Sequence, residues 1–166
     1  MQAFISPLAE LADFETVSKK SKQQKGILQF TGCVNSQKTH MMYALSDGCS
    51  YKVIACSSET KARQVYEEYK MLSADTYLYP AKDLLFYQAD IRSKELVRQR
   101  MEVLEAIISG KPVTVVTSFD GFMDALLPKE TIQDRIIHIG AEDTLDMEKM
   151  KYRLVEIGYE REEQIE

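Results

Sequence analysis

The sequence FTGCVNSQKTHMMYAL (Phe30–Leu45) has the layout of a phosphate-binding loop between a strand and a helix. The usual pattern is G-x-x-x-x-G-K-[ST], in which backbone N–H groups hold the phosphates and the Ser or Thr hydroxyl holds Mg²⁺. Gly32, Lys38 and Thr39 match the pattern, but Gln37 replaces the second glycine. The fold therefore begins with a predicted strand–loop–helix unit whose loop has lost one required residue.

Short apolar runs rich in β-branched and aromatic residues recur along the chain, each bounded by Gly, Pro, Ser or Asp. Two intervening segments, 57–75 and 93–111, place apolar residues at three- and four-residue spacing, which is typical of amphipathic helices. This alternation predicts an α/β fold with a mostly parallel sheet flanked by helices. The predicted strands are residues 26–32, 51–57, 76–80, 112–118 and 135–140.

Both ends of the chain differ from this alternating centre. Residues 6–24 predict one or two polar helices that lead into the first strand. After Gly140, residues 141–162 predict an amphipathic helix that follows the last strand. We therefore expect a first domain at residues 1–139 and the incomplete start of a second domain at residues 140–166.

The composition is that of an ordinary globular protein, with 45% apolar and 28% charged residues. The net charge of −5 argues against a generally basic nucleic-acid-binding protein. The cysteines lack C-x-x-C spacing and the two histidines are isolated, so neither a disulfide framework nor a metal site is expected. An acidic N-terminal segment and the lack of a long apolar stretch favour a cytoplasmic protein without a membrane span. We expect no cofactor.

The loop is predicted to have kept its shape without its ligand. The second glycine of a working loop permits close backbone approach and positive φ, whereas Gln37 places a side chain there. Hydrolysis also needs a strand that ends in Asp or Asp-Glu to hold Mg²⁺, but Asp120 follows the best apolar strand only after two further residues. We therefore predict no catalytic residues; the alternative is a small nucleotide-binding protein with an atypical loop. The residues of the vestigial loop are Gly32, Asn35, Ser36, Gln37, Lys38 and Thr39.

Three downstream segments carry a family resemblance. The first, 77–107, contains Tyr79-Pro80-Ala81, an acidic and apolar stretch at 83–90, and a helix with R-x-R. The second is VTVVTSFDGFMDALLPKE (113–130), and the third is MKYRLVEIGYEREEQIE (150–166). Together they resemble the N-terminal, UvrB-like region of the bacterial transcription-repair coupling factors (Mfd). The resemblance extends from about Pro7 to Glu166, and it departs from the family's L-P-P at Leu127-Pro128-Lys129.

This resemblance implies an N-terminal fragment, namely a helicase-like UvrB domain 1a with a degenerate phosphate loop and the first helix of the next domain. It implies a non-catalytic interaction module of a parent protein that is an ATP-dependent DNA translocase. That parent couples removal of stalled RNA polymerase to nucleotide excision repair by recruiting UvrA. The family's UvrA-binding surface lies on the second domain, mostly beyond Glu166. The implied partners are UvrA, RNA polymerase and other domains of the same chain, with weak or no DNA binding by the fragment.

Basic and aromatic side chains on two helical segments are the candidate interaction residues. On the 92–109 helix, we expect the arginines to face solvent or an acidic partner within the chain rather than DNA, because surrounding acids dilute the positive charge. The candidates are Arg98, Arg100, Arg153, Tyr159 and Arg161.

Overall fold

The computed structural model describes residues 5–11, 13–23, 26–82 and 90–160. The chain divides into two compact units, Met1–Ala125 and Leu126–Glu166, called unit 1 and unit 2 below. This division falls before Leu127-Pro128, earlier than the boundary expected between residues 139 and 140.

A parallel sheet forms the centre of unit 1. Its strands are β1 (Tyr51–Cys56), β2 (Thr76–Tyr79) and β3 (Val113–Ser118), in the spatial order β1-β3-β2. The central strand, β3, is buried at all six positions, as its continuous apolar and β-branched sequence predicts for a strand covered on both faces. The predicted α/β class with a parallel sheet is confirmed.

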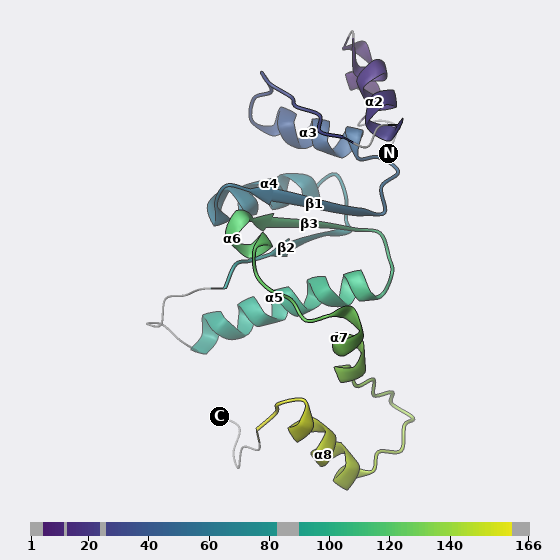
Figure 1. Ribbon diagram of the computed structural model, residues 1–166, viewed down its shortest axis with the longest axis vertical. Coiled ribbons are helices and arrows are strands. Elements are labelled where there is room, and N and C mark those ends of the chain that lie inside the picture. Colours follow the sequence, from purple (N-terminus) through teal and green to yellow (C-terminus); the bar gives the residue numbers. More distant parts are fainter. Residues whose placement is uncertain (1–4, 12, 24–25, 83–89, 161–166) are drawn as a thin grey trace. The chain divides into compact units, whose positions relative to one another are not determined.

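Helices α4 (Glu59–Lys70) and α5 (Asp90–Ile108) cover opposite faces of this sheet (Figure 1). The chain passes from β1 to β2 at the far side of the sheet, and it then returns to β3 between them. Because parallel strands are joined by right-handed crossovers, two connections that run in opposite directions place their helices on opposite faces. The cluster under α4 contains Cys56, Ala62, Val65, Leu78 and Val116. The cluster under α5 contains Tyr79, Val103, Val113 and Val115.

Local signals set the ends of these helices. Ser58 caps α4, because its side chain accepts a hydrogen bond of 3.3 Å from the Lys61 N–H. Gly110 follows α5 with φ +73°, a conformation that glycine adopts without steric cost. A serine at the start and a glycine after the end of a helix are signals that the sequence itself carries.

The N-terminal part of unit 1 contains the 3₁₀ helix η1 (Ser6–Glu10) and helices α2 (Phe14–Gln23) and α3 (Ser36–Leu45). Leu8, Phe14 and Ala44 form an apolar cluster that joins these three elements. The short helix α6 (Phe119–Phe122) directly follows β3, and Ser118 is its N-cap.

Unit 2 contains helices α7 (Lys129–Arg135) and α8 (Met147–Glu156). Asp146 caps α8 by accepting hydrogen bonds from the N–H groups of Glu148 and Lys149. The Arg153 guanidinium donates to the Asp134 carbonyl at 3.1 Å, which ties α8 to α7. The helix expected after Gly140 is therefore present.

Two predicted strands are wrong. Residues 26–32 form no strand, and Ile27 is 99% exposed. Residue 135 ends α7, and residues 136–140 have no regular structure. An apolar, β-branched run becomes a strand only when a neighbouring strand supplies hydrogen bonds and packing, and among the described residues no strand pairs with either run.

Candidate functional site

The loop between residues 32 and 39 makes two sharp backbone turns. Gly32 has φ +83°, and Asn35 has φ +44°, a region that Asn tolerates better than most residues. α3 begins at Ser36 with Asn35 at its N-cap, although the Asn35 side chain makes no capping hydrogen bond. The loop therefore leads into a helix N-terminus, as in a phosphate-binding loop, without the second glycine.

Gln37 closes this loop on itself. Its side-chain Oε1 accepts a hydrogen bond of 3.3 Å from the Val34 N–H. The N–H groups of Gln37 and Lys38 donate to the carbonyls of Val34 (3.0 Å) and Asn35 (3.2 Å). In a working loop, N–H groups at such positions point at phosphate oxygens. Here three of them already have acceptors within the chain, and a phosphate must compete with all three.

The Thr39 hydroxyl serves the packing of α3 on α4. Thr39 is 3% exposed, and its Oγ1 donates to Glu68 Oε2 at 2.6 Å. The other oxygen of Glu68 accepts from Gln64 Nε2 at 3.0 Å. In a working loop this hydroxyl holds Mg²⁺. The sequence analysis missed Glu68, because 29 residues separate it from Thr39. The sequence could have pointed to Glu68 only through its position next to Tyr69 on the predicted helix.

The other loop residues do not assemble a metal site. Gly32, Asn35, Ser36, Gln37 and Lys38 are all exposed. Asp120 lies exposed on α6. Within the described ranges, no group of three or more His, Cys, Asp or Glu residues is arranged to hold a metal ion.

Arg100 is held inside unit 1 rather than at its surface. Its guanidinium donates to Asp124 Oδ2 at 2.6 Å and to the Pro80 carbonyl at 2.9 Å. It also lies 4.2 Å from the centre of the Tyr79 ring, and the Arg100 side chain is 12% exposed. Burial raises the pKa of the Tyr79 hydroxyl. Arg100 therefore holds the residues that follow β2 in place. Its partner Asp124 is an acidic residue of the same chain, which the sequence analysis favoured over DNA.

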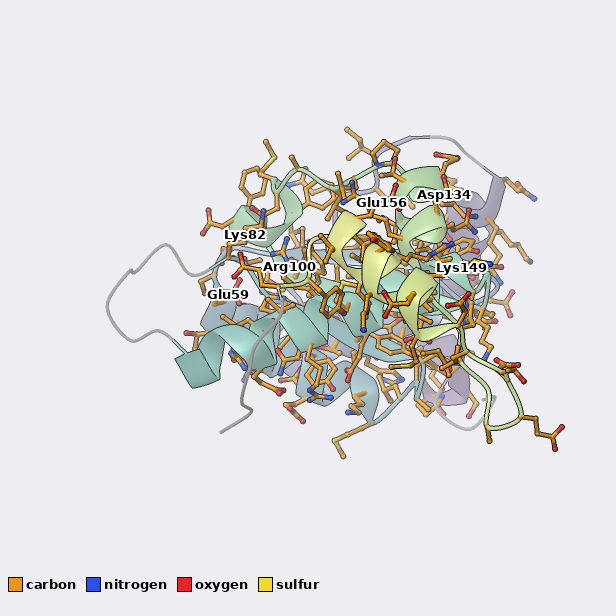
Figure 2. The ribbon with its side chains drawn as sticks, turned by 90° about the horizontal axis from the view of Figure 1, so that it is seen from below. Glu59, Lys82, Arg100, Asp134, Lys149 and Glu156 are labelled. Carbon is orange, nitrogen blue, oxygen red and sulfur yellow. The ribbon has the colours of Figure 1, made fainter. Side chains whose placement is uncertain are left out.

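Glu59 fixes the same edge of the sheet. Its Oε1 accepts hydrogen bonds from the Ala81 N–H at 3.1 Å and from the Ser118 hydroxyl. Figure 2 shows Glu59 and Arg100 on the same side of the molecule as Lys82, which follows Ala81. Ligands of open α/β sheets commonly bind beyond the carboxyl ends of the strands. Here Glu59, which the sequence analysis missed, and Arg100 use that edge to connect elements of the fold.

The remaining candidate interaction residues differ in accessibility. Arg98 is exposed and pairs with Glu95 at 2.7 Å and with Glu102, and the Arg98 hydrogen bond lowers the pKa of Glu95. Arg153 and Tyr159 are exposed in unit 2. Arg161 lies outside the described residues, as does the 83–89 part of the acidic and apolar stretch.

Comparison with known proteins gives a partial match. No protein-family model matches the chain. A transcription-repair-coupling factor of Staphylococcus aureus is 26% identical over 88 residues, which are 53% of this chain and 8% of that protein. The transcription-repair-coupling factor of Staphylococcus haemolyticus is 26% identical over 89 residues, which are 54% of this chain and 8% of that protein.

The chain resembles transcription-repair-coupling factors. The similarity covers about half of the chain and a small part of each relative, and these relatives are named for the coupling of transcription to repair. Among the residues that the structure describes, no helix has both the length and the apolar character needed to cross a membrane.

Proposed function

We propose that the chain is the N-terminal, non-catalytic UvrB-homology module of a transcription-repair-coupling factor. In this proposal, residues 1–139 correspond to domain 1a and residues 140–166 begin the domain that binds UvrA. The parent protein is a cytoplasmic, ATP-dependent DNA translocase that couples removal of stalled RNA polymerase to nucleotide excision repair. The similarity to named transcription-repair-coupling factors supports the family assignment.

The non-catalytic role is supported by the hydrogen bonding of the loop. Gln37 accepts from the Val34 N–H, and the Thr39 hydroxyl donates to Glu68. The groups that a phosphate and a Mg²⁺ ion would need are therefore already engaged within unit 1. These hydrogen bonds of Gln37 and Thr39 are the observation that supports a module that binds partners through its surface rather than catalysing a reaction.

The alternative is a small nucleotide-binding protein with an atypical loop. Positive φ at Gly32 and Asn35, together with the exposed Lys38, is the feature that favours it. It requires the nucleotide to displace Gln37 Oε1 and to bind without the Thr39 hydroxyl. Melting experiments with Mg-ATP, described below, separate the two functions.

Binding to UvrA tests the proposed module directly. Because the UvrA-binding surface is assigned to the second domain, the 166-residue chain is expected to bind UvrA weakly or not at all. A version extended through the whole second domain is expected to bind, and calorimetry with purified UvrA measures both. In the extended version, Arg153→Ala is expected to weaken binding, whereas the matched control Arg63→Ala, at an exposed position on α4 in unit 1, is expected to leave it unchanged. Equal affinity of the short and extended chains would contradict the proposal.

A further inference from the structure

Strand β1 has an unpaired edge within the described part of the chain. In the ladder with β3, the Val113 N–H donates to the Ser50 carbonyl at 2.8 Å, and Tyr51 lies opposite Val113. Backbone groups alternate in direction along a strand, so the N–H and C=O groups of Tyr51, Val53 and Ala55 point away from β3. A row of unpaired backbone groups of this kind is a template for another strand.

The side chains at this edge are apolar and uncovered. Tyr51 and Val53 lie opposite Val113 and Val115 in the register, and these two valines pack in the cluster under α5. That helix covers β2 and β3, and it leaves Tyr51 and Val53 56% and 58% exposed. Strands of parallel sheets are normally covered on both faces. β1 thus has the apolar sequence of an interior strand in the position of an edge strand.

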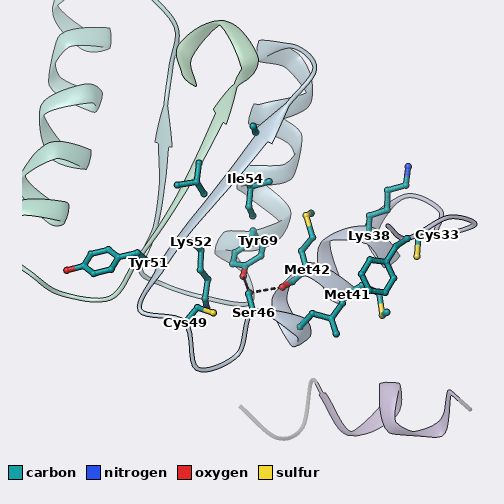
Figure 3. Close-up of a pocket in the computed structure, with 14 residues that line it drawn as sticks. Cys33, Lys38, Met41, Met42, Ser46, Cys49, Tyr51, Lys52, Ile54 and Tyr69 are labelled. Atoms are coloured by element: carbon teal, nitrogen blue, oxygen red, sulfur yellow. Dashed lines mark hydrogen bonds between the residues drawn. The ribbon is translucent and has the colours of Figure 1, made fainter. Parts of the chain in front are cut away.

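A mostly apolar cleft of about 560 Å³ lies along this edge (Figure 3). Residues 51–55 of β1 form one wall. Met41 and Met42 of α3 contribute to the opposite wall, with Cys33 of the loop. The cleft therefore separates β1 from the loop and helix that follow residues 27–31.

Residues 27–31 border the same cleft through Phe30. The segment has a strand-like composition, yet Ile27, Leu28 and Phe30 are exposed. Strand β1 and a segment of strand-like composition therefore border one cleft, and within the described residues neither the free edge of β1 nor residues 27–31 pair with a further strand. An apolar surface of this kind marks an interaction site.

We propose that at least one further β-strand of the same polypeptide, from outside residues 1–166, pairs with the free edge of β1 and fills this cleft. Its apolar side chains cover Tyr51 and Val53, and its far edge offers hydrogen bonds to residues 27–31. The inference rests on the proposed function, since it requires the longer parent chain. The matched segment makes up only 8% of the relatives, so most of such a polypeptide is available to supply the strand.

The cysteines of the chain provide a test. Cys33 and Cys49 line the cleft, whereas Cys56 is buried in the cluster under α4. Labelling by N-ethylmaleimide, measured by mass spectrometry, is compared between the 166-residue chain and the full parent polypeptide. Labelling of Cys33 and Cys49 is expected to slow by about tenfold or more in the parent, and Cys56 is expected to react slowly in both. Equal rates in the two proteins would overturn the inference. Protection that appears in the 166-residue chain and rises with its concentration would assign the edge to a second copy, which also overturns it.

Proline substitution provides a matched pair of variants. The Val53 N–H points to the free edge, so Val53→Pro keeps the ladder with β3 and removes a donor needed by the added strand. The control Ile54→Pro removes an N–H that points to β3, and it is expected to disrupt the sheet in both proteins. In the parent, Val53→Pro is expected to return Cys49 labelling to the rate of the isolated chain. Unchanged protection in that variant would show that the strand does not pair with β1.

Binding to UvrA is measured on the same samples. A parent that binds UvrA but leaves Cys33 and Cys49 fully reactive would refute the added strand and retain the proposed function. A parent with protected cysteines that fails to bind UvrA would refute the proposed function and retain the added strand.

Discussion

Replacing Thr39 by Val removes the hydroxyl and keeps the shape of the side chain. The Thr39 hydroxyl is buried and donates to Glu68 Oε2 at 2.6 Å, so its removal leaves a partly buried carboxylate with one partner fewer. A hydrogen bond to a charged group contributes about 1.5 to 3 kcal/mol. Glu68 still accepts from Gln64 and reaches solvent, so we expect the lower end, a loss of about 1.5 kcal/mol in the free energy of unfolding.

Lys38→Ala is the matched control for this change. Lys38 is the adjacent loop residue and is exposed, so its removal is expected to leave the stability of the ligand-free chain unchanged. A working loop predicts a different pattern, because both residues then act on the ligand. A nucleotide at 100 times its dissociation constant stabilises the fold by about 2.7 kcal/mol, and this stabilisation disappears in Lys38→Ala.

Thermal melting followed by circular dichroism, with and without millimolar Mg-ATP, measures both effects. A loss of about 1.5 kcal/mol lowers the melting temperature by roughly 4 °C in a chain of this size. A double-mutant cycle with Glu68→Gln is expected to give a coupling of about 1 kcal/mol between Thr39 and Glu68. Two results would refute the reasoning: a Thr39→Val chain that melts like the wild type, or a Mg-ATP shift of the wild type that Lys38→Ala abolishes.

Three other changes have defined outcomes. Arg100→Met is expected to lower the free energy of unfolding in urea by about 3 kcal/mol, because it leaves Asp124 without its buried partner, while Arg98→Met, at an exposed pair, leaves it unchanged. Burial raises the pKa of the Tyr69 hydroxyl above its ordinary value of 10.0, so this group stabilises the fold fully below that value and its stabilisation is lost as the pH rises. Urea unfolding at alkaline pH is therefore expected to show a smaller fall in the free energy of unfolding for Tyr69→Phe than for the wild type. Gln37→Gly is expected to release no phosphate from ATP, because the Thr39 hydroxyl stays hydrogen-bonded to Glu68. Measurable turnover would contradict this reasoning.

The parts of the fold that the sequence predicted are those that depend on local signals. Ser58 caps α4 through a residue three positions away, and Gly110 ends α5 through its own backbone conformation. The continuous apolar run of β3 predicted a strand buried on both faces, and all six of its residues are buried. Each of these signals lies within one turn or one strand of the residue that it affects.

The features that the sequence did not predict depend on residues far apart in the chain. Glu68 is 29 residues from Thr39, and Asp124 is 24 residues from Arg100. The strand predicted at residues 26–32 had the right composition, but composition cannot show whether a neighbouring strand is available. The same limit explains why residues 136–140 were predicted as a strand.

The loop differs from a working phosphate-binding loop in two independent features, and changing one leaves the other. Gln37 occupies the Val34 N–H, so Gln37→Gly frees that donor. The substitution leaves the Thr39 hydroxyl bound to Glu68, and it supplies no carboxylate to hold Mg²⁺. Conversely, a strand added beside residues 27–31 would anchor the backbone before Gly32 without changing the contacts of Gln37 or Thr39. Because the Thr39 hydroxyl joins α3 to α4 without any nucleotide, a Thr after the lysine at this position does not by itself indicate nucleotide binding.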